Sequence, residues 1–348
     1  MRSYGVDKNM ILETKISRPR LKFFDIDDSP FRIYGIWRDG DRYYRIPRAV
    51  AEKVSHNVHE VCANSTGGRI RFVTDSKYIA VKVNIDKAYT ISFMTFTGTL
   101  GLDVYADGKF AGSFRPPLEI ENNSFEAVVD FPDVRERVIT IHTPLYCDLK
   151  DLYVGIDSDA SLRSAPDYKY EKPIVYYGSS ITNGACASRP GLTYEAMISR
   201  MLDTNHHNLG FGGSAKAELA MAEYVAGLDM SIFVYDYDHN APTVEYLKET
   251  HERMFKIVRE KNPNLPIVMI SRPKYDFDED RDRRFAVIKE TYDNAVASGD
   301  KNVYILRGSD FFDEIGGDYT IDGTHPTDLG FYFMAKGIAP TLKMLLES

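Results

Sequence analysis

The sequence contains few cysteines and no long apolar run. Only Cys62, Cys147 and Cys186 occur among 348 residues, and no pair has the CxxC spacing of a metal site. Three cysteines cannot pair completely, so we expect free thiols in a reducing compartment. No stretch approaches the ~20 apolar residues of a membrane helix, and the first residues lack the apolar core of a signal peptide. We therefore expect a cytoplasmic protein with no membrane partner.

Positive charge is also scarce relative to negative charge. The chain has 43 Lys and Arg against 51 Asp and Glu, which gives a formal net charge of -8. Nucleic acids and anionic membranes are bound through basic surfaces, so this balance argues against both partners. The oligomeric state cannot be deduced from these features.

The first half of the sequence shows the period of strands. Apolar residues alternate at Ile79, Val81, Val83 and Ile85. Asp107–Gly108 stands between two such segments, and both residue types tolerate the positive φ of a tight hairpin turn. Many short strands and few helical segments predict an antiparallel β-sandwich of the jelly-roll type over residues 1–160.

From about Ile174 the period changes, and short apolar strands alternate with helical segments. One segment places Val244, Leu247, His251 and Met254 on a single helical face. This alternation predicts a doubly wound parallel sheet in an α/β domain over residues 174–348. Such sheets bind ligands beyond the carboxyl ends of their strands.

Ser180 follows directly on the first strand of this second half. A serine there lies at the edge of the sheet where substrates bind, although serines also cap helices without any catalytic role. The segment is not a GxSxG nucleophile elbow, because Thr182 stands where that motif needs glycine.

Asp322 and His325 lie just before the last helical segment. A serine nucleophile needs a base, and the base needs an acceptor that fixes its tautomer. An aspartate three residues before a histidine, in a turn opened by Gly323, can supply both roles. The alternative is a structural turn with a surface histidine.

Two intervening loops offer donors for a negative oxygen. Gly213 ends a glycine-rich run after the second strand, and Asn240 follows the third strand. Glycine lets a backbone N–H approach a ligand closely, and asparagine adds a neutral donor.

In order and content, these segments resemble the conserved blocks of SGNH (GDSL-type) hydrolases. Gly178–Ser180 stands for the GDS block, Gly213 for the second-block glycine, Asn240 for the third-block asparagine, and Asp322 with His325 for DxxH. The resemblance covers residues 174–346. It departs from the pattern at Ser179, which replaces an aspartate, and at Asp238–Ala241, which replaces GxND.

The resemblance implies a role for each of these residues. Ser180 would be the nucleophile, His325 the general base and later acid, and Asp322 the residue that orients His325. The backbone N–H groups of Ser180 and Gly213 and the Asn240 side chain would form the oxyanion hole. No metal and no cofactor is implied.

The first half resembles the N-terminal domain of a GxDLY-type subgroup, whose signature corresponds to Leu149–Tyr153 here. This layout is similar to that of bacterial carbohydrate acetyl esterases, in which a small jelly roll precedes the hydrolase domain. By this analogy we expect hydrolysis of a small acyl ester, acetyl in particular, on a carbohydrate or oligosaccharide. Arg189 and His239 are candidate substrate contacts, with a structural role as the alternative for each.

Three other functions stay open. Gly210–Ala215 fits a GxGxxA nucleotide-binding pattern, with Asp236 about 20 residues further on. The same fold could also serve acyl transfer, which shares its acyl-enzyme with hydrolysis, or carbohydrate binding alone.

Overall fold

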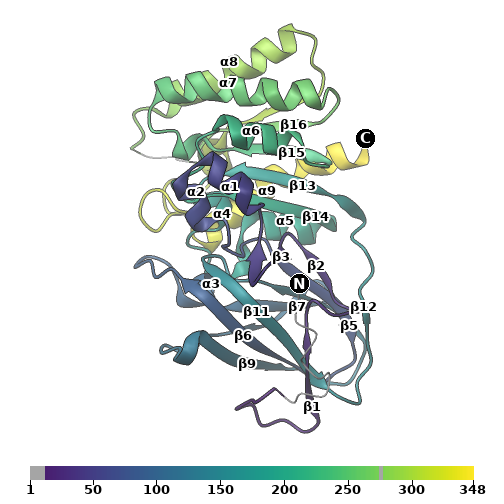
Figure 1. The fold of residues 1–348 in the computed structure, drawn as a ribbon. Coiled ribbons are helices and arrows are strands. Elements are labelled where there is room, and N and C mark those ends of the chain that lie inside the picture. Colours follow the sequence, from purple (N-terminus) through teal and green to yellow (C-terminus); the bar gives the residue numbers. More distant parts are fainter. Residues whose placement is uncertain (1–11, 274–276) are drawn as a thin grey trace.

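The computed structural model describes residues 12–273 and 277–348 (Figure 1). Its N-terminal half consists mainly of two antiparallel sheets. One has the strand order β1-β11-β6-β9 (Leu21–Asp25, Cys147–Asp157, Tyr78–Ala88, Ser124–Asp130). The other has the order β12-β5-β10-β7-β8 (Leu162–Ser164, Arg69–Thr74, Arg137–His142, Leu102–Ala106, Lys109–Phe114), with β2 (Arg32–Tyr34) also paired to β5.

The alternation read from the sequence explains why these strands form a sandwich. Ile79, Val81 and Val83 of β6 are fully buried in one core together with residues of the opposite sheet, such as Phe72. Gly108 and Asp107 both adopt positive φ at the β7–β8 hairpin. The predicted antiparallel β-sandwich is therefore confirmed.

The second half contains a five-stranded parallel sheet. Its strand order is β14-β13-β15-β16-β17 (Thr204–Gly210, Tyr170–Gly178, Ile232–Asp236, Ile267–Ile270, Val303–Leu306). The chain starts in β13, goes first to β14 on one side and then to β15 on the other. The direction of winding thus reverses between β13 and β15, which is where open α/β sheets bind ligands.

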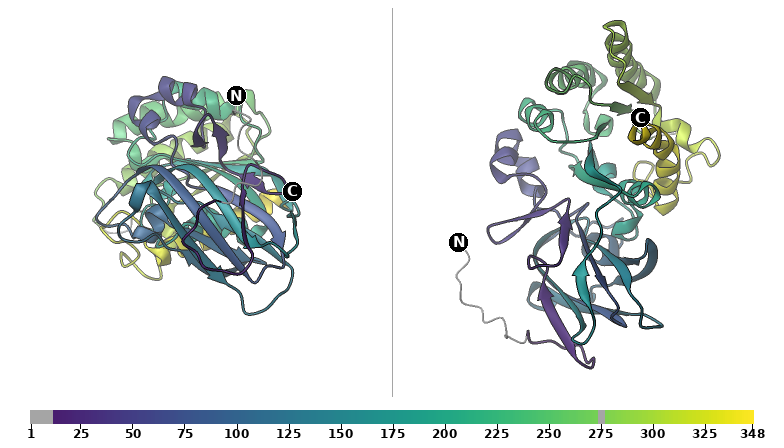
Figure 2. Two further views of the ribbon diagram at one scale, coloured as in Figure 1. Left: turned by 60° about the horizontal axis from the view of Figure 1, so that its bottom comes forward. Right: turned by 90° about the vertical axis from the view of Figure 1, so that its right-hand side faces the viewer.

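Helices cover both faces of this sheet, as Figures 1 and 2 show. One face packs against α6 (Leu219–Ala226), α7 (Val244–Lys261) and α8 (Arg281–Ala297), and the other against α5 (Tyr194–Leu202) and α9 (Asp328–Glu347). Successive residues of β13 point to opposite faces, so Val175 and Tyr177 join the first core, and Ile174 and Tyr176 the second. The doubly wound α/β fold is confirmed.

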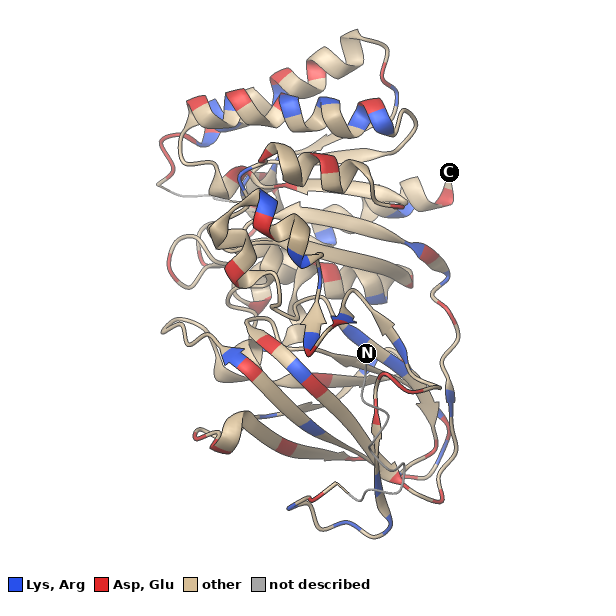
Figure 3. Cartoon of the chain, viewed as in Figure 1, with Lys and Arg blue, Asp and Glu red and all other residues tan. Residues whose placement is uncertain are grey.

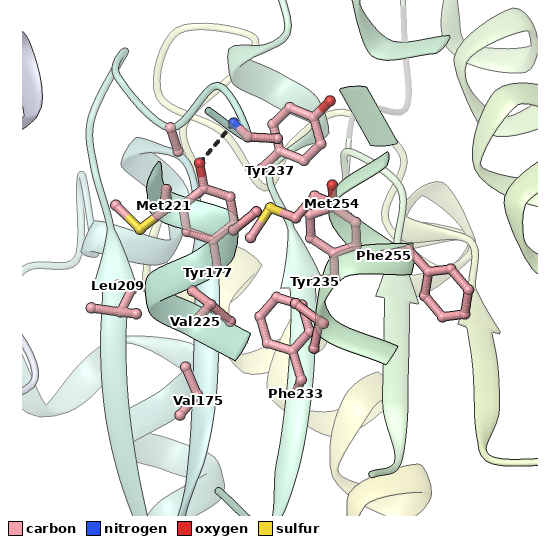
Figure 4. Packing of buried hydrophobic residues seen from close by; sticks show 14 of the residues in the cluster. Val175, Tyr177, Leu209, Met221, Val225, Phe233, Tyr235, Tyr237, Met254 and Phe255 are labelled. Atoms are coloured by element: carbon pink, nitrogen blue, oxygen red, sulfur yellow. Dashed lines mark hydrogen bonds between the residues drawn. The ribbon is translucent and has the colours of Figure 1, made fainter. Parts of the chain in front are cut away.

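Aromatic rings and sulfur-containing side chains fill the first of these cores (Figure 4). Tyr177, Tyr235 and Tyr237 lie side by side between the strands and the side chains of Met221 and Met254. The hydroxyl of Tyr177 accepts a hydrogen bond of 2.9 Å from the backbone N–H of Ala217, so this buried polar group is satisfied.

Helix α7 shows how the sequence pattern produces an element. The Thr243 side chain caps its first turn by accepting the N–H of Tyr246 at 3.1 Å. Leu247, His251 and Met254 are buried as predicted, and charges of both signs line the outer face of the helix (Figure 3). One of them, Lys256, pairs with Glu252 one turn earlier at 2.9 Å.

The N-terminal half also supplies part of the α/β core. After the small β3–β4 hairpin (Trp37–Asp39, Arg42–Tyr44) the chain forms α1 (Arg48–Val54) and α2 (His56–Val61). Ala51, Val54 and Val58 of these helices pack in the same cluster as β13, β15 and α6. The division at 1–160 and 174–348 stays a prediction about domains, but the cores do not follow it, because an early segment covers the second sheet.

The remaining elements are short. Helices α3 (Phe96–Leu100) and α4 (Ser180–Asn183) lie where the two halves meet, and the 3-10 turns are η1–η4 (Glu121–Asn123, Pro190–Leu192, Asp238–Asn240, Gly308–Phe312). Cys62, Cys147 and Cys186 are buried free thiols. Over the residues that the structure describes, none of the helices has both the length and the hydropathy needed to cross a membrane.

Candidate active site

Ser180 is presented by a sharp turn at the carboxyl end of β13. The strand ends at Gly178, and Ser179 caps α4 by accepting the N–H of Ile181 at 3.1 Å. A Cβ atom on Gly178 would collide with the Thr182 hydroxyl, so glycine permits the turn. Ser180 is therefore the first residue of α4, at the predicted ligand-binding edge of the sheet.

The structure brings Ser180, His325 and Asp322 into one chain of hydrogen bonds. Ser180 Oγ lies 2.9 Å from His325 Nε2, and His325 Nδ1 lies 2.7 Å from Asp322 Oδ2. An ionised carboxylate can only accept, so Nδ1 carries the proton and Nε2 is left to accept the serine hydroxyl. Two segments separated by more than 100 residues thus meet with the geometry of a nucleophile, a base and an orienting acid.

The turn that carries Asp322 also fixes its charge. Asp322 Oδ1 accepts the backbone N–H groups of His325 at 2.8 Å and Thr324 at 3.0 Å, while Gly323 takes a positive φ of 79°. Partial burial by itself would raise the pKa of Asp322, but the hydrogen bonds from His325 and Thr324 lower it below the ordinary value. The group is a carboxylate at neutral pH.

The two predicted donor loops lie beside the serine. A Cβ built on Gly212 would lie 3.6 Å from the Cβ of Ser180, which places this glycine loop against the nucleophile turn. Gly213 follows with a φ of 69° and open space where a side chain would be. Asn240 in η3 is held to the same loop, because its Nδ2 donates to the Phe211 carbonyl at 2.9 Å. The structure thus brings the two candidate donor loops together at the nucleophile turn.

Two contacts of the site come from the N-terminal half, and sequence reasoning missed both. The Phe93 ring stacks on the His325 imidazole, with centroids 5.1 Å apart and planes 22° apart. The Tyr146 hydroxyl donates to the Ser180 carbonyl at 3.4 Å. No local motif marks either residue, because only the packing of the two halves brings them to the site.

Asp236, the acid of the nucleotide-binding alternative, lies beneath the serine turn. It is almost completely buried, and it accepts hydrogen bonds from Thr182 at 3.3 Å and from the Tyr194 hydroxyl at 3.1 Å. Burial raises its pKa to about 8. A carboxyl group enclosed in this way is not presented to a ribose, so the structure argues against a dinucleotide site.

The structure separates the two predicted substrate contacts. Arg189 is bonded to the β-sandwich: its Nη1 donates to Asp103 and to the Tyr105 hydroxyl, both at 2.7 Å. These bonds give Arg189 a structural role, and its contact with substrate stays a prediction. His239 is half-buried in η3, directly before Asn240, and its contact with substrate stays a prediction.

Comparisons with known proteins agree with the fold of both halves. Residues 171–343 match the GDSL-like lipase/acylhydrolase family, and residues 21–162 match the GxDLY domain found at the N-terminus of SGNH-hydrolase-type esterases. No curated protein matches the chain.

Several solved structures are similar over almost the whole chain. A chain from Bacteroides ovatus described as a GDSL-like lipase has 31% identity and a TM-score of 0.84, over 94% of this chain and 98% of that one. A salicylyl-acyltransferase from a tetracycline biosynthetic pathway has 20% identity and a TM-score of 0.76, over 94% and 98%. An acetyl xylan esterase from Butyrivibrio proteoclasticus has 14% identity and a TM-score of 0.60, over 94% and 99%. The last two show likeness of fold alone.

The family matches and the 31% identical relative together establish the class of the protein. The chain belongs to the GDSL-like lipase/acylhydrolase family of SGNH hydrolases and carries the GxDLY-type N-terminal domain of SGNH esterases.

Proposed function

We propose that this protein is a serine esterase that removes small acyl groups, acetyl in particular, from a carbohydrate. The observation that supports it most strongly is the hydrogen-bonded chain from Ser180 through His325 to Asp322 at the carboxyl edge of β13. The carbohydrate part of the proposal comes from the whole-chain likeness to an acetyl xylan esterase.

In the first step Ser180 Oγ attacks the ester carbonyl while His325 Nε2 takes the hydroxyl proton. The imidazolium that forms is stabilised by the Asp322 carboxylate at Nδ1. The negative oxygen of the tetrahedral intermediate is stabilised by the N–H groups of Ser180 and Gly213 and by the Asn240 amide. His325 then gives its proton to the leaving alcohol, and the acyl group stays on Ser180.

In the second step a water molecule loses a proton to His325 and attacks the acyl-enzyme, which releases the acid and restores the serine. If an alcohol takes the place of water, the reaction is acyl transfer. Both outcomes use the same intermediate, so the products decide between them.

The three free thiols favour a reducing compartment, and we propose the cytoplasm.

The test is acid release from p-nitrophenyl acetate and from acetylated xylo-oligosaccharides, by the wild type and by Ser180→Ala. In a well-studied serine hydrolase, loss of the nucleophile lowers kcat on the order of 10⁶-fold. Ser180→Ala should therefore release no measurable acid from either substrate. Ser179→Ala is the matched control, because it removes a neighbouring hydroxyl that only caps α4. Equal activity in the wild type and Ser180→Ala, or none in either, would overturn the proposal.

The alcohol acceptor distinguishes hydrolysis from transfer. With added free oligosaccharide, an esterase still releases one acid per ester cleaved, whereas a transferase converts the acceptor into a new ester. Mass spectrometry of the acceptor measures this directly.

A further inference from the structure

The segment between β6 and α3 reaches from the β-sandwich to the catalytic histidine. Phe93 lies in this segment, and its ring stacks on His325 with a centroid distance of 5.1 Å and an interplanar angle of 22°. The imidazole side chain is only 17% exposed, and Phe93 is itself 36% exposed. One face of the base is therefore covered by the N-terminal half.

Hydrogen bonds at Phe93 and at Thr95 connect this segment to the loop after the nucleophile. The Cys186 thiol donates to the Phe93 carbonyl at 3.7 Å, and the Thr95 hydroxyl donates to the Ser188 carbonyl at 2.8 Å. Ser188 in turn donates its N–H and its hydroxyl to the Asp328 carboxylate, at 2.8 and 2.6 Å. Asp328 begins α9, three residues after His325. The Phe93 segment, the loop after the nucleophile and the start of α9 are thus tied to one another across the two halves.

The chemistry of His325 gives the stacked ring a function. The imidazole becomes positively charged when it takes the Ser180 proton, and an aromatic face within about 6 Å of a cation attracts it. Three titratable groups lie near this imidazole: Asp322, Cys186 and Asp328. Asp322 stays ionised, the Cys186 thiol lies near Asp322, and Asp328 accepts a hydrogen bond from the Ser188 hydroxyl. Burial raises the pKa of Cys186 to about 12, so this thiol stays neutral.

We propose that Phe93 is a positioning residue for the general base: it fixes the plane of the His325 ring and stabilises the imidazolium that forms during acyl transfer. This inference rests on the proposed function, and it assigns the N-terminal half a part in the chemistry. Phe93 touches the base and not the reacting atoms, so its removal should change kcat and the pH profile more than KM.

The experiment compares Phe93→Leu, which keeps an apolar side chain but loses the aromatic face, with Phe93→Tyr, which keeps it. Phe24→Leu is the matched control, because Phe24 is a half-buried sandwich residue that also contacts another ring. For each protein, kcat and KM on p-nitrophenyl acetate are measured from pH 5 to 8, and thermal unfolding checks the fold. The His325 ring signal is titrated by NMR and assigned with His325→Gln.

In Phe93→Leu we expect kcat to fall about two- to fivefold with little change in KM, and the acid limb to move about half a pH unit lower. The NMR midpoint of His325 should move by the same amount and direction. Phe93→Tyr and Phe24→Leu should retain the wild-type values, and Phe93→Met repeats the test if Phe93→Leu is poorly folded.

An unchanged NMR midpoint in folded Phe93→Leu would overturn the proposal, as would a change confined to KM. The NMR readout does not require activity. Suppose that the wild type shows no Ser180-dependent esterase activity, but the NMR midpoint of His325 still moves as expected in Phe93→Leu. That result would refute the proposed function and retain the role of Phe93.

Discussion

Two local structures position Ser180, His325 and Asp322. The serine stands at the first position of a four-residue helix, and the other two share a turn in which the backbone N–H of His325 is bonded to Asp322. Asp322 therefore does two things at once, because Oδ1 shapes the turn and Oδ2 orients the imidazole.

Replacing Asp322 by Asn should separate these two tasks. The amide can still accept the backbone N–H groups, but it cannot provide the negative charge that stabilises the imidazolium, and it favours the wrong histidine tautomer. By analogy with the same change in a serine protease triad, we expect kcat to fall about 10⁴-fold at neutral pH. Steady-state kinetics measure the loss, and unchanged thermal unfolding would show that the turn is intact. A loss below about tenfold would indicate that His325 is oriented by other contacts.

The pH profile follows from the same residues. Because hydrogen bonds keep the pKa of Asp322 below its ordinary value, this group does not titrate near neutral pH. Activity should fall on the acid side as His325 is protonated, since a protonated imidazole cannot accept the Ser180 proton. The measurement is kcat/KM from pH 5 to 8, and a flat profile would argue against histidine as the base.

At the scale of elements, helix α7 carries a histidine in its apolar face. His251 stacks on Tyr235 with centroids 4.5 Å apart, and its Nδ1 lies 2.9 Å from the Thr291 hydroxyl of α8. Burial lowers the pKa of His251 to about 3. Below the ordinary histidine pKa of about 6.5, the unfolded chain takes up a proton that the folded chain does not.

This difference predicts an acid-dependent loss of stability that is linked to one residue. Stability rises with pH wherever the unfolded state binds more protons. His251 therefore leaves the unfolding free energy almost unchanged at pH 7 and lowers it progressively between about pH 6.5 and 3. His251→Gln should remove about 2 kcal/mol of the decrease in unfolding free energy between pH 7 and 4.5. Urea unfolding at both pH values measures this, with the exposed His56→Gln as control. If the unfolding free energy decreases equally between pH 7 and 4.5 in wild type and in His251→Gln, the burial of a neutral imidazole is contradicted.

At the scale of the whole molecule, Arg45 joins the two halves beneath the site. This fully buried guanidinium donates to the carbonyls of Asn64 at 2.9 Å and Gly210 at 2.6 Å and to Asn183 Oδ1 at 3.0 Å, and it lies 4.4 Å from the Phe211 ring centroid. Asn183 ends α4, and Gly210 and Phe211 lead into the glycine loop. One side chain from the first half thus supports both loops that surround Ser180.

Arg45→Met should destabilise the protein strongly, because methionine fills similar space but leaves these buried acceptors without donors. We expect the unfolding free energy to fall by about 3–5 kcal/mol. Arg48→Met, at an exposed position three residues on, should change it by less than about 0.5 kcal/mol. The unfolding free energies of both variants are measured by denaturant unfolding, monitored by circular dichroism and by tryptophan fluorescence. A small effect of Arg45→Met would mean that water satisfies the acceptors.

Most of the α/β half could be predicted from sequence because its signals are local. The period of the apolar residues defined the strands and α7, and the serine, glycine, asparagine and DxxH segments each followed or preceded an element that places them at one edge of the sheet. The contacts of Arg189 could not be predicted in this way. Its partners, Asp103 and Tyr105, lie more than 80 residues away on another sheet, and no local pattern encodes that pairing.

The sequence alone determined the fold of each half and the candidate residues Ser180, His325 and Asp322, because periodicity and block order are properties of neighbouring residues. Only the tertiary structure decided how the halves join. Helices α1 and α2 cover the second sheet, Arg45 supports the serine turn, and Phe93 stacks on His325. These contacts depend on packing between segments far apart in the chain, where the free energy comes from burial and from satisfying buried polar groups rather than from any local preference.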